Sequence, residues 1–555
     1  MTLDPRVEAA YAALTPGQRA RLSLALAGSV AAAIPAHTGP PVVSSGQLRL
    51  WFLDQLRPGS AAYVVPLALR LDGPLDHAAL SAALDAVVAR HEILRTTYPA
   101  RDGRPFARVA PALSVSMPVV ETSDVARALR AEASRPFDLA TGPLLRATLL
   151  RVAPDEHVLL LSQHHIVTDG WSLPLLVGEL IDRYRGVAPV AAGASYADYA
   201  AWQRDRLDRG DLDGHVGFWR DRLRDVPALT LPPGPGAGTE ISWPADLVAP
   251  LRELARAERA TLFMALLAVV GAVLARATGR SEVVVGTTVA GRSRPELEGT
   301  LGFFVNTLPM PVSVAGDPTL RELIGQVRRT VLDGLAHADA PYERIAAGRA
   351  RTALTSVLLT LRDTPPVIPG VTVLPAPVVE PKAPLGWELS EDGTGGLTGR
   401  FEHALRPGVA ERLEREVRAV LAGGLRTGAA WLAADQPPTA EPSSGSAAGE
   451  LPRDAVEALV VRIWAEILQT PSVGALDDFF DLGGHSLLAT QAAARLQEAL
   501  GLPVPLDGLL GLATARDLAG YLRDLGAAAG LDVEARAASG GPPIATVRRL
   551  ERRAR

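Results

Sequence analysis

The sequence predicts a layered α/β fold of two lobes, followed by a small all-helical domain. Three observations lead to this prediction. Strand-length apolar runs alternate with helical periodicity over residues 43–425, a stretch rich in Pro, Ser, Gly and Ala follows at 435–450, and apolar residues then recur only at helical spacing. A chain of 555 residues also exceeds what one hydrophobic core usually supports, so two or more compact units are expected.

The composition is that of a globular chain and excludes several kinds of partner and site. Hydrophobic residues make up 48% of the chain and charged residues 21%. The formal net charge of -5 provides no broad basic surface, so nucleic acid is not expected as a partner. Because the chain has no cysteine, disulfides, cysteine nucleophiles and cysteine metal sites are excluded, and no metal site is expected.

No segment of the sequence predicts insertion into a membrane. The N-terminus lacks the basic, then apolar, then small-residue order of a signal peptide. The longest uncharged apolar stretch, residues 260–275, is shorter than the roughly 18 to 20 residues of a membrane span. We expect it to form a buried core helix, and we expect the protein to be cytoplasmic with no membrane partner.

The elements of the large region follow in order. A capped helix start at Thr15, ended by a stretch rich in Pro and Gly, predicts a leader helix and linker over residues 1–42. Segments such as LALRLDG and HVLLLSQHH then have the character of strands, whereas HAALSAALDAVVARHEIL and SLPLLVGELIDRYR have helical periodicity. Strands interleaved with helices predict α/β lobes over residues 43–430, the first about 43–210 and the second about 211–430.

A change of composition ends the second lobe. The segment DQPPTAEPSSGSAAGE holds almost nothing to bury, so residues 431–452 are expected to form a flexible linker. Two stretches with helical apolar spacing then predict a small helical domain over residues 453–525. Residues 526–555 are rich in Ala and Gly, end in VRRLERRAR, and are expected to be a mobile or docking tail.

The segment HVLLLSQHH predicts a buried strand that ends in His164 and His165. Side chains alternate between the faces of a strand, so only one of the two can readily face a given cavity. Neutral imidazole can take a proton from an attacking amine near neutral pH. In the next turn Asp169 can pair with a cation, Gly170 permits a tight reversal, and Ser172 can cap the following helix. Taken alone, the pair is also compatible with two structural histidines.

A second motif, LGGHSLL, lies in the small helical domain. It places two glycines and a histidine before Ser486, which is expected to lie at the exposed N-terminus of a helix. Taken alone, Ser486 is also compatible with a simple N-cap.

Six ordered segments of the large region resemble the motifs of nonribosomal peptide synthetase condensation domains. HHIVTDG matches the family pattern HHxxxDG, and the others are SGQLRLWFLDQL, RHEILRTTY, YADYAAWQ, GTTVAGRSRPELEGTLGFFVNTLPMPV and HADAPYERI. A last motif is weak, because RARTALTSVLLTLRD stands where relatives carry an Arg-Asn-Pro-rich stretch before a Phe-Gln pair. The resemblance covers roughly residues 43–425.

The resemblance implies a two-lobed fold like that of chloramphenicol acetyltransferase, with His165 at the centre of a tunnel between the lobes. His165 would position the amine and accept its proton. Asp169 would pair with Arg292, and the backbone amide of Gly170 would help to stabilise an oxyanion. The residues that the resemblance assigns to the site are His164, His165, Asp169 and Gly170, with structural support from Arg95, Arg292 and Asn306.

The motif LGGHSLL resembles the peptidyl carrier family, a small four-helix bundle. The resemblance implies that 4'-phosphopantetheine is attached to Ser486 by a phosphopantetheinyl transferase and supplies the thiol that the chain lacks. No adenylating domain lies between the two regions. A trans-acting adenylation enzyme, an upstream donor carrier protein, and a downstream synthetase or tailoring enzyme are therefore the other expected partners.

The function predicted from the sequence is that of an acyltransferase. It would form an amide between a donor acyl group on a partner carrier and an aminoacyl group on its own carrier domain. Two alternatives stay open: an enzyme that forms an ester or accepts a free amine, and an inactive platform that recruits tailoring enzymes. The intact HHxxxDG pattern argues against the platform.

Overall fold

The computed structural model describes most of the two lobes and of the C-terminal helical unit. The described residues are 33–189, 193–227, 229–347, 354–362, 368, 370–377, 379–422, 450–468, 470, 473–479, 482, 486–505, 512 and 514–538. The predicted leader helix, most of the predicted linker and the basic end of the predicted tail lie outside these residues.

The first lobe is built on a five-stranded sheet in the order β13-β1-β8-β7-β6. Its strands are β1 (Val64–Asp72), β6 (Val119–Glu121), β7 (Leu145–Ala153), β8 (Glu156–His164) and β13 (Val371–Leu374). Two small hairpins accompany it: β2 (Thr96–Thr97) with β5 (Arg108–Val109), and β3 (Ala100–Arg101) with β4 (Arg104–Pro105). Strand β8 is central and antiparallel to both neighbours.

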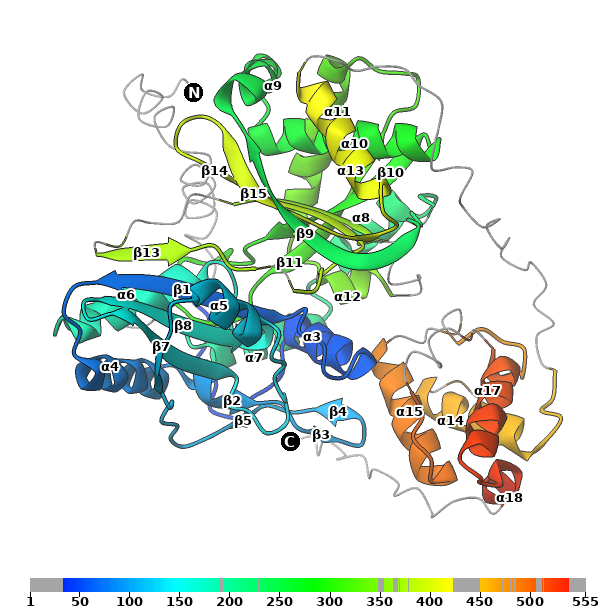
Figure 1. Ribbon diagram of the computed structural model, residues 1–555. Coiled ribbons are helices and arrows are strands. Elements are labelled where there is room, and N and C mark those ends of the chain that lie inside the picture. Colours follow the sequence, from blue (N-terminus) through cyan, green and yellow to red (C-terminus); the bar gives the residue numbers. More distant parts are fainter. Residues whose placement is uncertain are drawn as a thin grey trace.

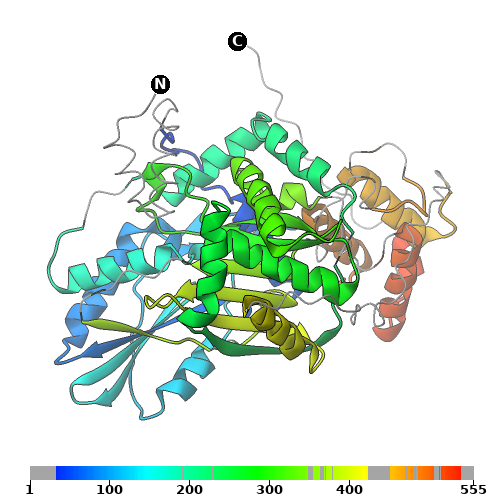
Figure 2. The ribbon, with the colours of Figure 1, turned by 90° about the horizontal axis from the view of Figure 1, so that it is seen from above.

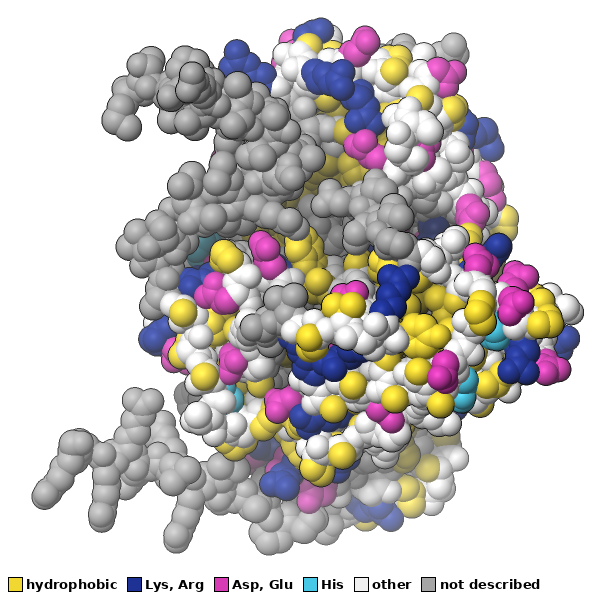
Figure 3. Space-filling model, turned by 90° about the vertical axis from the view of Figure 1, so that its left-hand side faces the viewer, with side chains coloured by type: hydrophobic (Ala, Val, Ile, Leu, Met, Phe, Trp, Pro, Cys, Tyr) yellow, Lys and Arg dark blue, Asp and Glu magenta, His cyan; other side chains and the backbone are white. Residues whose placement is uncertain are grey.

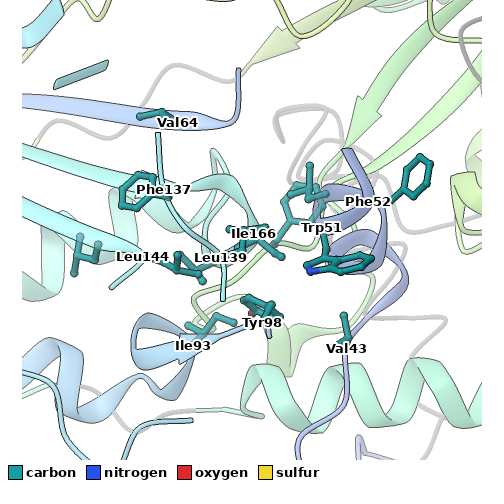
Figure 4. Packing of buried hydrophobic residues seen from close by; sticks show 14 of the residues in the cluster. Val43, Trp51, Phe52, Val64, Ile93, Tyr98, Phe137, Leu139, Leu144 and Ile166 are labelled. Carbon is teal, nitrogen blue, oxygen red and sulfur yellow. The ribbon is translucent and has the colours of Figure 1, made fainter. Parts of the chain in front are cut away.

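The described part of the first lobe also includes five helices and two short 3-10 turns. They are α3 (Ser45–Leu56), α4 (His77–Arg90), η1 (Glu92–Arg95), α5 (Val125–Ala133), η2 (His165–Val167), α6 (Ser172–Tyr184) and α7 (Tyr196–Asp208). Figure 4 shows part of their core, in which Ile166 lies among Trp51, Leu139 and Tyr98. Each of these four side chains is at most 3% exposed, so the turn that carries His165 stands on a closely packed base.

The second lobe is built on a six-stranded sheet in the order β11-β10-β12-β14-β15-β9. Its strands are β9 (Pro233–Trp243), β10 (Glu282–Val289), β11 (Asn306–Ser313), β12 (Val357–Arg362), β14 (Leu385–Glu391) and β15 (Leu397–Leu405). Its helices are α8 (Asp213–Leu223), α9 (Ala245–Ala257), α10 (Leu262–Thr278), η3 (Pro295–Leu297), α11 (Leu320–Ala336), α12 (Tyr342–Ile345) and α13 (Val409–Leu421).

The helices of the second lobe cover one face of its sheet. Figure 1 shows α9, α10, α11 and α13 on the side of this sheet away from the first lobe. Helix α10 is buried along nearly its whole length, which confirms the core helix expected around residues 260–275. Within the described residues no single helix is long and apolar enough to cross a membrane, and α9 with α10 meets that test only as a pair bent by 108°.

The predicted division into two consecutive lobes differs from the structure at one strand. Strand β13 comes from the sequence of the second lobe, yet it pairs with β1 at the edge of the first sheet, with Leu69 opposite Val373. The reason is that β1 has an open edge there, and an edge strand with unpaired N–H and C=O groups accepts a further strand. The two lobes are therefore joined through a shared sheet as well as through the chain.

The described residues of the C-terminal unit include helices α14 (Ala455–Leu468), α15 (Ser486–Leu500), α17 (Ala515–Ala528) and α18 (Val533–Ala538). It extends past the predicted end at 525, because α18 packs on α14 and α15, with Val533 buried and Arg536 donating to the Leu500 carbonyl at 2.6 Å. Helix α15 also contacts α3 and β4, where Arg104 donates to the Gln491 side chain at 2.9 Å. Figures 1 and 2 both show this unit at one side of the two lobes.

Candidate active site

The end of strand β8 places His165 at the junction of the two lobes. The backbone N–H of His165 donates to the Tyr63 carbonyl at 2.8 Å, and the chain then turns through η2. From the second-lobe sequence, the ring of Phe303 meets the His165 ring edge to face, with 5.2 Å between the ring centroids. Two lobes therefore define the orientation of one imidazole.

The His165 ring is held in one tautomer. Its Nδ1 lies 2.7 Å from the Thr168 carbonyl oxygen, and because a carbonyl only accepts, Nδ1 carries the hydrogen. Nε2 is then unprotonated and keeps its lone pair. Burial, and next the charge of the Lys382 ammonium, lower the pKa of His165 to about 3, so the ring is neutral near neutral pH.

The preceding histidine has a different environment. His164 is 3% exposed, and its ring lies 6.4 Å from Tyr63 and 6.2 Å from Phe137, centroid to centroid. Its Nδ1 accepts a hydrogen bond from the Ile166 backbone N–H at 3.1 Å. The sequence grouped both histidines at the reactive centre, whereas in the structure His164 packs inside the first lobe because consecutive strand residues face opposite sides.

Asp169 and Arg292 form the ion pair that the sequence suggested. Arg292 Nη2 lies 3.2 Å from Asp169 Oδ1, and the two side chains are only 2% and 0% exposed. The second carboxylate oxygen accepts from the Phe304 backbone N–H at 3.0 Å. Arg292 also donates to the carbonyls of Leu297 and Thr300. This network fastens the turn after His165 to the segment that leads into β11.

Ser172 does not cap helix α6 as predicted. Ser172 is the first residue of the helix and Trp171 is its N-cap, and Asp169 Oδ1 accepts from the Ser172 backbone N–H at 2.8 Å. The Ser172 hydroxyl instead donates to the Gly302 carbonyl at 2.9 Å and accepts from Arg292 at 2.9 Å. A buried arginine needs several acceptors, and the hydroxyl provides one of them.

Gly170 lies beneath the guanidinium of Arg362, which comes from β12 of the second lobe. A Cβ atom added at Gly170 would lie 3.7 Å from Arg362 Cζ, an ordinary van der Waals distance. The backbone of Gly170 is outside the left-handed region, so the reversal predicted to need glycine could be made by other residues. The position instead brings a cation close to the reactive turn.

The comparisons with known proteins identify both parts of the chain. Residues 40–360 match the family described as "Condensation domain", and residues 458–522 match the one described as "Phosphopantetheine attachment site". The first match covers more than half of the chain. The chain belongs to the condensation-domain family. The reaction of this family is amide-bond formation, an acyl transfer, and the second match is the site at which 4'-phosphopantetheine is attached.

The condensation domain is similar to parts of much larger synthetases. It is 44% identical over 328 residues to a linear gramicidin synthase of Brevibacillus parabrevis, and 42% identical over 380 residues to phosphinothricin tripeptide synthetase PhsC of Streptomyces viridochromogenes. The alignments cover 55% and 62% of this chain but only 4% and 34% of those two proteins. The chain thus spans a small part of the length of these relatives.

The structural comparison confirms the predicted two-lobed fold. The X-domain in its complex with OxyB from teicoplanin biosynthesis aligns with a TM-score of 0.63 at 27% identity, over 71% of this chain and 95% of that chain. The strands and turns that hold His165 and the Asp169–Arg292 pair lie inside the segment that matches the condensation domain.

Several buried polar residues of the condensation domain support the turn and were not singled out from the sequence. Gln47 donates to the Ile166 carbonyl at 3.2 Å and to the Tyr98 hydroxyl at 2.6 Å. The Tyr196 hydroxyl donates to the Phe303 carbonyl at 2.6 Å. All three lie inside segments that resemble family motifs, so the signal was present, but sequence spacing does not show which members of a motif meet.

Among the described residues, neither of the two other predicted support residues forms a hydrogen bond or ion pair with His165. Arg95 donates to the Ala110 carbonyl and pairs with Glu92 at 3.6 Å, so its described contacts stay within the first lobe. Asn306 donates to the carbonyls of Ala338 and Ala340 at 2.9 and 2.7 Å. It ties the start of β11 to the segment before α12. Both residues stabilise the scaffold.

Ser486 is the first residue of helix α15 in the C-terminal unit. The backbone N–H groups of the first turn of a helix have no partner inside the helix and form a favourable site for a phosphate. A helix of 15 residues that begins at the serine therefore fits a phosphate ester at this position. The chemistry of a serine hydroxyl, which can be esterified, fits the same group.

Proposed function

We propose that the chain forms an amide bond between a donor acyl group carried by a partner protein and an aminoacyl group carried at Ser486. The observation that carries this proposal is the His165 ring: the bond to Thr168 leaves Nε2 unprotonated, and the ring is held between the two lobes. The membership of the condensation-domain family and the match to the phosphopantetheine attachment site support it.

In the proposed reaction the amine nitrogen attacks the carbonyl carbon of the donor thioester. The C–N bond forms, the C–S bond breaks, and the amine loses a proton. His165 Nε2 accepts a hydrogen bond from the amine and aligns its lone pair with the carbonyl carbon. Because its pKa is about 3, the ring is a weak base, so it passes the proton on to the leaving thiolate instead of retaining it.

Attachment at Ser486 would supply a thiol at the end of a long flexible arm. Ser486 would hold the phosphate ester, and the first-turn amides of α15 would bind its oxygens. Tethering raises the effective concentration of the acyl group at the condensation site to about the millimolar range without any new contact. We further propose that a separate adenylation enzyme charges the arm, that an upstream carrier protein delivers the donor, and that a downstream synthetase or tailoring enzyme receives the product.

Reconstitution tests the proposal. The chain is treated with a phosphopantetheinyl transferase and an aminoacyl-coenzyme A, then mixed with an acylated donor carrier, and its intact mass is followed. We expect the mass of one arm, then of the joined product. Ser486→Ala should accept no arm, and His165→Ala should accept the arm but form product more slowly by about 100-fold or more. His215→Ala, on α8, is the matched control. Full condensation by His165→Ala would contradict the proposal.

A second function is favoured by one comparison. The similar X-domain is solved in complex with OxyB, so this chain could recruit a tailoring enzyme to its carrier without condensing anything. The same experiment separates the two functions. A platform would accept the arm and would form no product with amine, hydroxyl or free-amine acceptors, and His165→Ala would leave its binding of a tailoring enzyme unchanged.

A further inference from the structure

The sheet of the second lobe presents a charged face toward the reactive turn. Its apolar side chains point to the helices, so the alternate residues of each strand point the other way. The pairing of Thr360 with Glu388 and of Glu388 with Arg400 places these residues side by side. The charged residues of this face are Arg362, Glu388, Arg400 and Glu402, joined by Lys382 from the segment before β14.

The two carboxylates of this cluster are already paired with guanidinium groups. Glu388 forms ion pairs with Arg362 and, at 3.2 Å, with Arg400. Arg400 also lies 3.9 Å from Glu402. Burial acts to raise the pKa of Glu388, but the neighbouring cations hold it well below its ordinary value, so this carboxylate is charged.

The ammonium of Lys382 has no such partner. Among the described residues it makes no hydrogen bond and no ion pair, although it is only partly exposed. Burial lowers its pKa, and the carboxylates of Glu388 and Glu402 act in the opposite direction from beyond contact distance. The cluster thus contains three cations and two carboxylates. The cation without a direct partner among the described residues is Lys382. An unpaired, partly buried charge is costly unless a ligand balances it.

Lys382 is also the only lysine in the chain, which has 56 lysine and arginine residues in total. Everywhere else the chain uses arginine as its cation. An ammonium is compact and directs its charge at one point, whereas a guanidinium is a planar fork that needs several acceptors. The carboxylates of the cluster are already paired with the two guanidinium groups. The compact ammonium of Lys382 therefore stays available to bind a negatively charged ligand.

The cluster lies close to the reactive centre. The Arg362 guanidinium covers Gly170, and the charges of Lys382 and Arg362 both act on the His165 ring. An anion bound here must therefore lie near the reacting carbonyl. The phosphate of a pantetheine arm cannot meet this requirement, because phosphate and thiol are at opposite ends of the arm.

We propose that Lys382 and Arg362 bind a carboxylate carried by one of the two acyl groups that the chain joins. The substrate class is an acyl or aminoacyl thioester with an acidic side chain or a free distal carboxyl group. The inference rests on the proposed condensation reaction and specifies its selectivity. The carboxylate supplies the missing counter-charge and orients the chain of the substrate toward His165.

The test compares acidic substrates with their neutral isosteres. Glutamyl and glutaminyl groups are loaded in turn on the donor carrier and on Ser486, and product is measured by intact mass. In the wild type the acidic group should react about tenfold or more faster than its isostere at one of the two positions. Lys382→Met should abolish the difference in rate between the acidic group and its isostere, and Lys382→Arg should retain part of that difference. The exposed Arg209→Met is the matched control.

Three results would overturn the inference. They are equal rates for acid and isostere at both positions in the wild type, a Lys382→Met variant that slows all substrates alike, and one that loses stability with its selectivity unchanged. If neither acidic nor neutral substrates give product in the wild type, the proposed function fails and not only its selectivity.

A binding measurement gives a second readout. Because Lys382 is the only lysine, an amine-reactive reagent modifies the chain there and at its N-terminus, and peptide masses distinguish the two. A non-hydrolysable pantetheine amide with a distal carboxylate should protect Lys382 at a concentration about tenfold lower than the matching carboxamide does. Equal protection by both compounds would contradict the inference.

Discussion

Two charged regions contact the same turn, and they differ in how completely their charges are paired. The Asp169–Arg292 pair is almost fully enclosed, and its groups bind the backbone at Phe304, Leu297 and Thr300. The Arg362–Glu388 cluster is more exposed, with 44% of the Arg362 side chain accessible, and it leaves the Lys382 ammonium without a direct partner among the described residues. A network in which every charge is paired holds the backbone in place. A network with one unpaired cation can bind a negatively charged ligand.

Breaking the Asp169–Arg292 pair should have the largest effect on the free energy of unfolding. Asp169→Ala leaves Arg292 charged and buried without its carboxylate, and we expect a loss of about 3 to 5 kcal/mol in the free energy of unfolding. Denaturant titration measures it. The control is Asp205→Ala, which removes an exposed pair with Arg209 and should change stability by no more than about 1 kcal/mol. Similar losses in both variants would contradict the assignment.

A drop of one pH unit below about pH 6.5 should be the next strongest perturbation, because both histidines are neutral in the folded state. Burial lowers the pKa of His164 and of His165 to about 3, whereas an unfolded histidine titrates near 6.5. Above about pH 6.5 neither state binds the proton, so this effect vanishes. Between about pH 6.5 and 3 only the unfolded chain binds it, and each histidine lowers stability by about 1.4 kcal/mol per pH unit.

Unfolding at several pH values checks this second prediction. His164→Asn retains a side-chain acceptor for the Ile166 N–H but cannot titrate, so the slope below about pH 6.5 should fall by the contribution of one histidine. The exposed His77→Asn, at the start of α4, is the control. An unchanged slope in His164→Asn would show that this histidine already takes up a proton in the folded state.

Removing a carboxylate from the Arg362–Glu388 cluster should have a smaller effect on stability and a measurable effect on the preference for acidic substrates. Glu388→Gln removes the carboxylate shared by Arg362 and Arg400, which are partly exposed and can be hydrated, so we expect a stability loss of about 1 kcal/mol. The added positive charge should raise the preference for acidic acyl groups. Competition between glutamyl and glutaminyl substrates measures it, and a lower preference would count against the anion site.

The smallest effect is expected at the contact between the turn and the cluster. Gly170→Ala requires no left-handed backbone and places its Cβ 3.7 Å from Arg362, so stability should change by no more than about 0.5 kcal/mol. Gly302→Ala is the contrasting variant, because its Cβ would overlap the Tyr196 ring. Thermal unfolding distinguishes them, and a large loss in Gly170→Ala would show that the turn is more constrained than its geometry indicates.

The sequence predicted the α/β lobes, the helical unit and the His165 motif because these depend on periodicity and on short local patterns. It also suggested the Asp169–Arg292 pair through the family resemblance. It could not show that the Ser172 hydroxyl binds Gly302 and Arg292 instead of capping α6, because both partners lie more than 100 residues away in the sequence. Lys382 lies in no recognised motif, and its importance follows from the position of the segment before β14 beside the charges of Glu388 and Glu402.

The face of the molecule in Figure 3 shows basic and acidic side chains interspersed among apolar ones. The charge imbalance around Lys382 is local, and the net charge of -5 does not reveal it. Residue counts give only the total charge of the chain. The pairing of β12 with β14 brings the charges of Arg362 and Glu388 together in one cluster.

Strand β13 has a consequence for how the chain acquires its fold. The first sheet pairs β1 with residues 371–374, about 300 positions later in the chain, so its edge stays open until the second lobe has been synthesised. Contacts of such separation form slowly, and an exposed strand edge can pair with other chains in the meantime. A fragment that ends near residue 210 should therefore self-associate, and the two lobes should be expressed together as one folding unit.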